Sequence, residues 1–189
     1  MGRIPKKYKP KPVCHPVSEK IKMICKLQAS EFNAALHVVN DAAEVYKGVI
    51  PEDRWKEPYM SAEELKEEIE SGVQFYGFEE KGALVAVMGI QRVRKVTLIR
   101  HAYVLTSFQR LGFGERLLKR LISVAQTPEI LVGTWKAAEW AVSFYEKNGF
   151  NLVSPEEKNR LLHEYWNIPE RQVETSVVLK LRKCAAVRL

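Results

Sequence analysis

The sequence has few cysteines and lacks the regular cysteine and histidine spacings of common metal sites. The three cysteines, Cys14, Cys25 and Cys184, are scattered along the chain and form no C-x-x-C pair. An odd, dispersed set is typical of a reducing compartment and provides no disulfide framework. The four histidines show no ligand spacing with these cysteines, so we expect no metal site.

Long apolar runs are also missing. The longest candidates, such as "ALVAVMGI" at residues 83–90, have the length of a strand and fall far short of the ~20 residues that span a bilayer. Because no apolar signal region stands near the N-terminus, we expect a cytoplasmic protein without a membrane anchor. Hydrophobic residues make up 46% and charged residues 28% of the 189, which indicates one globular domain and excludes a disordered chain.

Acidic residues are absent from both ends of the chain, and this absence locates the net charge of +7. The ends carry the basic residues Arg3, Lys6, Lys7, Lys9, Lys11, Lys180, Arg182, Lys183 and Arg188. Since the remainder is close to neutral, the charge indicates solvated tails, and we do not expect nucleic acid as a partner. We predict a flexible basic arm at 1–17, one domain at 18–183 and a tail at 184–189.

Apolar periodicity predicts that strands and helices mix along this domain. The expected helices cover 30–49 (capped by Ser30), 61–72, 114–126, 137–149 and a short segment that begins near Ser154. The expected strands cover 20–28, 73–80, 83–93, 96–104, 130–135, 150–154 and 174–181. This arrangement predicts an α/β or α+β fold around a central sheet.

A glycine-rich turn separates the strand at 96–104 from the helix at 114–126. We name it the glycine turn: Gln109, Arg110, Leu111, Gly112, Phe113 and Gly114, with the pattern Q-x-x-G-x-G. Free N–H groups at a helix N-terminus attract anions, and glycines let a phosphate approach them. A dinucleotide fingerprint is excluded because Leu117 stands where its third glycine belongs, and no Walker loop is present. A turn that is merely tight is the alternative.

A second motif, A-x-x-x-Y-x-K-x-G-F, follows about thirty residues later, from Ala141 through Tyr145 to Phe150. With both motifs in this order, the chain resembles the GNAT superfamily of acyl-CoA-dependent N-acyltransferases over roughly residues 21–181. The resemblance implies a mixed central sheet with two splayed parallel strands and flanking helices. It also implies acetyl-CoA as cosubstrate and a primary amine, on a small molecule or peptide, as acceptor. Homodimerisation is left open, as is a non-catalytic acyl-CoA sensor of the same fold.

The resemblance implies how the coenzyme binds. The pyrophosphate would lie on the amides from Arg110 to Gly114, and the pantetheine arm would pair with the strand backbone at Ala102 and Val104. The Val104 amide would stabilise the negative charge that develops on the thioester oxygen. Tyr145 would be the general acid for the departing thiolate, and ordinary pKa values of about 10 and 8.5 make that transfer modest in cost. A packing aromatic on a buried helix face is the alternative for Tyr145.

The chain departs from the family pattern where some members carry a general base. Leu98 and Arg100 occupy those positions, and an arginine stays protonated. Arg100 would instead clamp an acceptor carboxylate or phosphate, or pair with a neighbouring acid. Strand alternation places Leu98, Arg100 and Ala102 on one face and His101 on the other, unless the strand bulges. Water, Glu139 or Glu174 would then take the proton, and His101 would be a further candidate if the strand bulges there.

Two smaller departures concern the coenzyme. Thr106 replaces a proline common after the strand, which we expect to be harmless, and Ala138 replaces an asparagine that contacts the coenzyme. The acceptor wall is expected to include Trp55, Tyr59 and Trp135. For each of these, packing in the core is the alternative interpretation.

Overall fold

The computed structural model describes residues 24–183, so the predicted arm at 1–17 and tail at 184–189 lie outside the described residues. The described chain forms one sheet of seven strands in the order β1-β2-β3-β4-β5-β7-β6. The strands are β1 Ile24–Lys26, β2 Gln74–Glu80, β3 Ala83–Val93, β4 Val96–Val104, β5 Glu129–Trp135, β6 Asn151–Leu152 and β7 Ser176–Arg182. Only β4 and β5 run parallel; all other neighbours are antiparallel.

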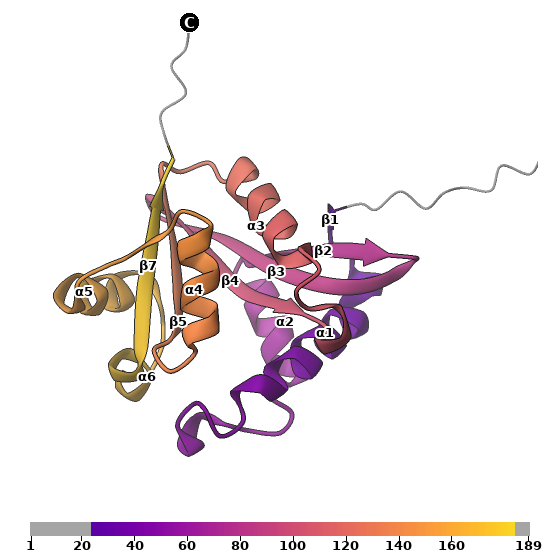
Figure 1. Ribbon diagram of the computed structural model, residues 1–189, viewed down its shortest axis with the longest axis horizontal. Coiled ribbons are helices and arrows are strands. Elements are labelled where there is room, and N and C mark those ends of the chain that lie inside the picture. The colour runs from indigo at the N-terminus through magenta and orange to yellow at the C-terminus, as the bar shows by residue number, and fades with distance from the viewer. Residues whose placement is uncertain (1–23, 184–189) are drawn as a thin grey trace, which may run out of the picture.

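Six α-helices cover this sheet (Figure 1). They are α1 Phe32–Ala43, α2 Ala62–Glu70, α3 Phe113–Val124, α4 Glu139–Lys147, α5 Pro155–Tyr165 and α6 Glu170–Thr175. Helices α3 and α4 pack on one face, through a cluster that contains Leu117, Leu121 and Tyr145. Helices α1 and α2 cover the opposite face beside β3, and α5 covers it beside β7. The predicted fold class, a mixed sheet with flanking helices, is confirmed.

Most predicted elements agree with the structure. Of the strand expected at 20–28 the structure shows Ile24–Lys26, and residues 20–23 lie outside the described residues. Two helices differ from the prediction. The helix expected over 30–49 divides into a 3₁₀ turn at Ala29–Glu31, α1 and a second turn at Glu44–Tyr46. Ser30 is therefore not the cap. The backbone amide of Gln28 instead donates to the Glu31 carboxylate at 2.7 Å. Residues 174–175, expected at the start of the last strand, instead end α6, which was not predicted.

The parallel strands separate halfway along β4. Pairing runs from Val96–Glu129 to Ile99–Val132 and then stops, whereas β5 stays paired with β7 up to Trp135. Figure 1 shows β4 and β5 diverging towards the lower part of the molecule. The second half of β4 therefore keeps β3 as a partner on one side and has a free edge on the other.

A β-bulge at His101 changes the facing of β4. Gly89 pairs with Arg100 and Val87 with Tyr103, so Met88 lies opposite two residues, and His101 has φ +51°. Arg100 and His101 consequently both approach Glu68 of α2, while Ala102 packs on the α3 side. The expectation that Arg100 and Ala102 share a face is wrong, because an extra residue in a strand reverses the alternation beyond it.

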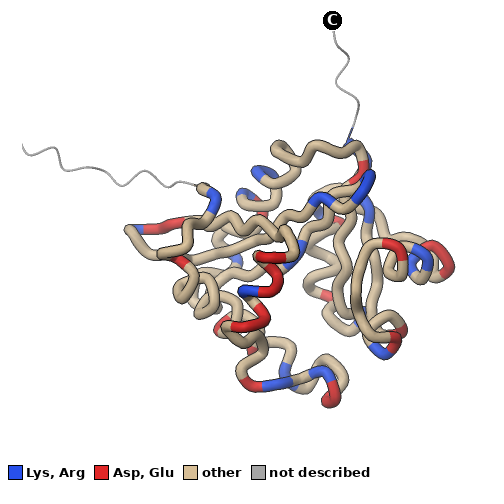
Figure 2. The backbone as a smooth tube through the Cα atoms, turned by 180° about the vertical axis from the view of Figure 1, so that it is seen from behind, with Lys and Arg blue, Asp and Glu red and all other residues tan. Residues whose placement is uncertain are grey.

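Within residues 24–183, no helix is both long and apolar enough to cross a membrane. Figure 2 shows basic and acidic residues distributed over many segments of the described backbone, with acidic residues prevailing along α2.

Candidate active site

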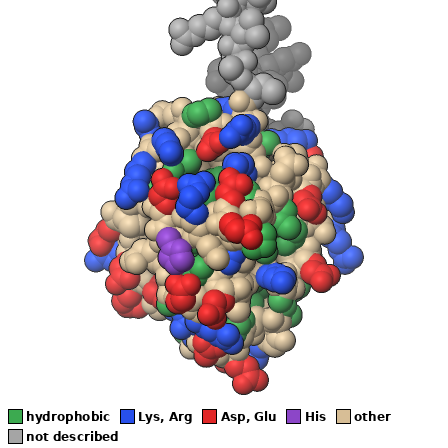
Figure 3. Space-filling view, turned by 90° about the vertical axis from the view of Figure 1, so that its left-hand side faces the viewer, with side chains coloured by type: hydrophobic (Ala, Val, Ile, Leu, Met, Phe, Trp, Pro, Cys, Tyr) green, Lys and Arg blue, Asp and Glu red, His purple; other side chains and the backbone are tan. Residues whose placement is uncertain are grey.

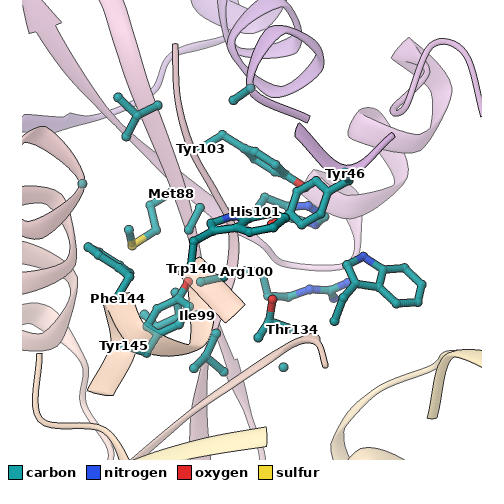
Figure 4. A pocket seen from close by; sticks show the side chains of 18 of the residues that line it. Tyr46, Met88, Ile99, Arg100, His101, Tyr103, Thr134, Trp140, Phe144 and Tyr145 are labelled. Carbon is teal, nitrogen blue, oxygen red and sulfur yellow. The ribbon is translucent and has the colours of Figure 1, made fainter. Parts of the chain in front are cut away.

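A cavity of about 520 Å³ opens where β4 and β5 separate (Figure 4). Its wall includes Ala102 and Val104 of β4, Arg110 and Gly114 of the glycine turn, and Tyr145 of α4. The structure thus brings together the elements that the two sequence motifs singled out. Their roles in binding a ligand remain predictions.

The glycine turn presents backbone amides rather than side chains. Gly112 is the N-cap of α3 and has φ +82°, and Arg110 has φ +60°. The first helical bond runs from the Arg116 amide to the Gly112 carbonyl at 3.1 Å, so the amides that precede it have no partner within the helix. Such amides, at the positive end of the helix dipole, form an anion site.

Gly112 and Gly114 are favoured as glycines for different physical reasons. A Cβ on Gly112 would meet no atom within 4 Å, so glycine is favoured there by its positive φ alone. A Cβ on Gly114 would lie 3.4 Å from Val104 Cγ2 and 3.7 Å from the Phe144 ring. Gly114 therefore allows α3 to lie close to both β4 and α4, which keeps the turn beside the separating strands.

The side chain of Phe113 anchors the glycine turn to the core. Its ring is buried, and its centroid lies 4.7 Å from that of the Phe78 ring. Leu111, by contrast, is 62% exposed. The Arg116 guanidinium lies 4.6 Å over the Phe78 ring, which holds it in a cation–π contact. Arg110 is the basic side chain of the turn that lines the cavity.

The free edge of β4 faces the cavity with backbone that pairs with no neighbouring strand. The Leu105 amide donates to the Val85 carbonyl at 2.9 Å, and in an antiparallel pair the next residue points its polar groups the other way. The Val104 amide is thus directed at the gap, and its carbonyl accepts from Gln109 Nε2 at 3.2 Å. An extended, amide-containing ligand could pair with this edge as an added strand would.

Tyr145 belongs both to the core and to the cavity wall. It is 5% exposed, its ring packs edge-to-face against Phe144 and Phe150 at 5.1 and 5.6 Å, and it lines the cavity. Burial raises the pKa of its hydroxyl well above the ordinary value. Proton donation from this side chain to a thiolate therefore costs more than unperturbed values suggest.

A buried charge cluster lies on the other side of β4. Arg100 Nη2 is 2.8 Å from Glu68 Oε1, and Nη1 donates to Gln91 Oε1 at 3.1 Å. His101 Nε2 lies 3.3 Å from Glu68 Oε2, and its ring stacks on Phe75 at 5.6 Å. Burial works to raise the pKa of Glu68, but His101 and Arg100 outweigh it and hold the pKa below its usual value.

This cluster changes two sequence-based interpretations. Arg100 lines the cavity, but its charge is largely compensated by Glu68. His101 lines the cavity on the same side as Arg100, because of the bulge that alternation alone could not predict. Glu139 and Glu174 are not among the described residues that line it.

Aromatic residues form the wall opposite the glycine turn. Tyr59 and Trp135 line the cavity as predicted from the sequence, whereas Trp55 lies behind Tyr59, with ring centroids 5.6 Å apart. Tyr46 and Trp166 also line it, although nothing in the sequence predicted either. They come from the 3₁₀ turn η2 (Glu44–Tyr46) and from the end of α5, and no motif marks either segment.

Thr106 does more than replace a proline. Its amide and hydroxyl both donate to Asp41 Oδ2, at 2.7 and 2.5 Å, and so tie the end of β4 to α1. Burial works to raise the pKa of Asp41, but these two bonds outweigh it and lower the pKa. A proline has no amide hydrogen and could not make the first bond.

Among residues 24–183, no group of three or more His, Cys, Asp or Glu side chains is placed to hold a metal ion.

Comparisons with known proteins agree with this geometry. Residues 37–163 match the family model described as acetyltransferase (GNAT) domain. A GNAT-family acetyltransferase from Staphylococcus aureus Mu50 superposes with a TM-score of 0.66 at 16% identity, covering 85% of this chain and 98% of that one. The PaiA N-acetyltransferase of Thermoplasma acidophilum, solved in complex with coenzyme A, gives 0.66 at 17% identity with the same coverages.

The ribosomal-protein-S18-alanine N-acetyltransferase of Escherichia coli gives a TM-score of 0.60 at 18% identity, over 89% of this chain and 99% of that chain. At such identities the structural likeness shows the fold, and the family model shows the membership. The chain belongs to the GNAT family of acetyltransferases.

Proposed function

We propose that this protein transfers an acetyl group from acetyl-CoA to a primary amine by direct attack within a ternary complex. The observation that carries the proposal is the single cavity that joins the glycine turn, the free edge of β4 and Tyr145. Family membership and the coenzyme A found in the Thermoplasma relative support this choice of cosubstrate.

Each part of the cavity has a task in this reaction. The amides from Arg110 to Gly114 bind the diphosphate, and the backbone at Ala102 and Val104 pairs with the pantetheine arm. This places the thioester between the separated strands, with its oxygen at the Val104 amide. A backbone donor held rigidly in a sheet stabilises developing negative charge without reorganising.

The chemistry then requires two proton transfers. The amine nitrogen forms a bond to the carbonyl carbon, the C–S bond breaks, and the thiolate takes a proton from the Tyr145 hydroxyl. The nitrogen loses one proton to His101, which returns it to the Tyr145 oxygen through solvent, so that protons balance over the cycle. Burial raises the pKa of Tyr145 and so makes complete proton transfer to the sulfur costly. A hydrogen bond from its hydroxyl to the negatively charged sulfur is therefore an important part of its contribution.

His101 is the base in this proposal because of its neighbours. Glu68 lies 3.3 Å from Nε2, and a carboxylate there favours the tautomer that leaves Nδ1 free to accept a proton. The bulge brings this residue to the cavity wall beside Arg100. Leu98 stands at a position where some family members carry a base, but it is fully buried in a cluster with Leu131 and Leu162.

Turnover with a pool of primary amines tests the proposal. The purified chain, acetyl-CoA and the pool should release free coenzyme A, detected as a thiol, above the rate without amine. Stabilisation against heat by acetyl-CoA without thiol release with any amine would contradict acetyl transfer and identify a non-catalytic acyl-CoA sensor. The absence of both effects would remove the coenzyme assignment as well.

A further inference from the structure

The aromatic wall of the cavity has a definite composition. We call it the acceptor chamber; its members are Tyr46, Tyr59, Tyr103, Trp135, Trp140 and Trp166. They come from η2, the loop before α2, β4, the end of β5, α4 and the end of α5. Elements far apart in the sequence therefore supply large rings to one cavity, and Figure 4 labels Tyr46, Tyr103 and Trp140 among them.

The rings support one another. Tyr46 stacks on Tyr59 at 5.9 Å with an interplanar angle of 16°, and Trp140 tilts against Tyr46 at 5.6 Å. Tyr103 meets Tyr59 edge-on at 6.4 Å. A set of rings fixed by mutual packing forms a preorganised surface for apolar or aromatic groups.

The acceptor chamber has no anionic group. Among the described residues that line the whole cavity, none is Asp or Glu. Arg100 and Arg110 are the basic ones, and Arg100 is already paired with Glu68 at 2.8 Å. A second ammonium group on an acceptor would therefore lose its hydration here without gaining a counterion, which is costly in a largely apolar site.

The tyrosine hydroxyls do not replace the missing carboxylate. Burial raises the pKa of both Tyr46 and Tyr103 far above the ordinary value, so both phenols stay neutral. The Tyr46 hydroxyl lies beside Thr134, and that of Tyr103 beside Tyr59. These groups can orient one neutral amine by hydrogen bonds, but they cannot balance an additional positive charge.

From this lining, and resting on the acetyl transfer proposed above, we propose the acceptor class. The acceptor is a small primary amine on an apolar or aromatic body that carries no second positive charge. Polyamines and other multiply cationic amines are excluded. The residues that determine this preference are the rings of the acceptor chamber.

A matched pair of acceptors tests the proposal. Hexylamine and 1,6-diaminohexane have the same chain length and differ by one ammonium group, and 2-phenylethylamine adds an aromatic body. With acetyl-CoA, kcat/KM for hexylamine and 2-phenylethylamine should exceed that for the diamine by about tenfold or more. Equal values, or a preference for the diamine, would overturn the proposal.

A substitution at an exposed residue of the cavity wall tests the cause of the acceptor preference. Val45 lines the cavity and is 43% exposed, so V45E can add a carboxylate without burying it. V45E should shift the ratio of kcat/KM towards the diamine, whereas the isosteric control V45Q should keep the wild-type ratio. An unchanged ratio in V45E would show that the missing carboxylate does not set the preference.

Binding measured without turnover separates this proposal from the proposed function. Calorimetric titration of the three amines into the wild-type chain saturated with coenzyme A reports acceptor affinity alone. Tighter binding of hexylamine than of the diamine, with no thiol release, would retain the acceptor preference while acetyl transfer fails. Tighter binding of the diamine, or binding of none of the three, would overturn the preference even if another amine is acetylated.

Discussion

Tyr145 contributes both to the hydrophobic core and to the cavity wall. Its ring fills space between Phe144 and Phe150, which explains why it is buried. Its position in the cavity wall makes the hydroxyl available to a ligand. The two interpretations that the sequence left open are therefore compatible.

The substitution Tyr145→Phe removes this hydroxyl and preserves the ring. We expect turnover to fall by about 10- to 100-fold, because general acid assistance is typically worth a few powers of ten and the raised pKa weakens this acid. Coenzyme A affinity, measured by calorimetry, should stay within about twofold, since the backbone supplies the main contacts. Unchanged turnover would show that Tyr145 is only a packing residue.

His101 is the residue for which the structure adds most to the sequence. The groups that face it are Glu68 of α2, Arg100 of β4 and the Phe75 ring of β2. As a base it must be deprotonated to act, so kcat/KM should rise with pH as the base loses its proton.

His101→Asn should lower kcat by about 100-fold and abolish that rise, with coenzyme A affinity retained. His163→Asn is the matched control, because His163 lies on α5 with its side chain 55% exposed and pairs with Glu170. A pH profile in His101→Asn that keeps the wild-type shape would exclude His101 as the base.

At the scale of elements, the turn before α3 and the attachment of β4 to α1 determine the shape of the cavity. Gly112 adopts a conformation that other residues reach only with strain, and Thr106 links two elements that are distant in the sequence. Neither feature involves a side chain that would contact the acetyl group. Both should therefore affect binding or stability more than the chemical step.

The substitution Gly112→Ala forces a Cβ into the left-handed region at φ +82°. It should lower the free energy of unfolding by about 1–2 kcal/mol, measured in urea, and weaken coenzyme A binding by distorting the amides of the turn. Leu111→Ala is the control, since this side chain is 62% exposed. Normal coenzyme affinity in a folded Gly112→Ala protein would show that the turn does not bind the diphosphate.

The substitution Asp41→Asn replaces the charged acceptor of the two Thr106 bonds with a neutral one. Because these bonds outweigh burial and lower the pKa of Asp41 in the folded state, they stabilise the fold above the unfolded pKa of about 3.9. The stabilisation is lost as pH falls through the lower folded value.

Urea unfolding should therefore show Asp41→Asn less stable than wild type by up to about 1 kcal/mol at pH 7, with the difference shrinking in strong acid. A difference that stays constant down to pH 2.5 would contradict this origin.

At the scale of the whole molecule, the sequence predicted the parts with local signals. The helix expected at 61–72, the neighbouring strands at 73–80 and 83–93, and the glycine turn each depend on neighbours in the chain, and all are observed. A capping box of Ser61 and Glu64 starts that helix, and a turn at Lys81 and Gly82 joins those strands. The mixed sheet with two separating parallel strands also followed from the family resemblance.

What could not be predicted depends on contacts between distant segments. The bulge at His101 depends on how β4 pairs with β3, and strand alternation gave the wrong facing. Tyr46 and Trp166 reach the cavity only through the packing of η2 and α5. The compensation of Arg100 by Glu68 joins residues 32 positions apart, which no local pattern reveals.

On the side that carries α5 and α6, both signs of charge lie next to one another (Figure 3). A nucleic-acid interface on that side would instead show basic residues gathered together.

A crystal structure of the chain with acetyl-CoA tests the central claim most directly. The account predicts the diphosphate within hydrogen-bond distance of the amides from Arg110 to Gly114, the pantetheine along β4, and the thioester oxygen at the Val104 amide. A diphosphate bound anywhere else, or a thioester that does not enter the gap between β4 and β5, would contradict it.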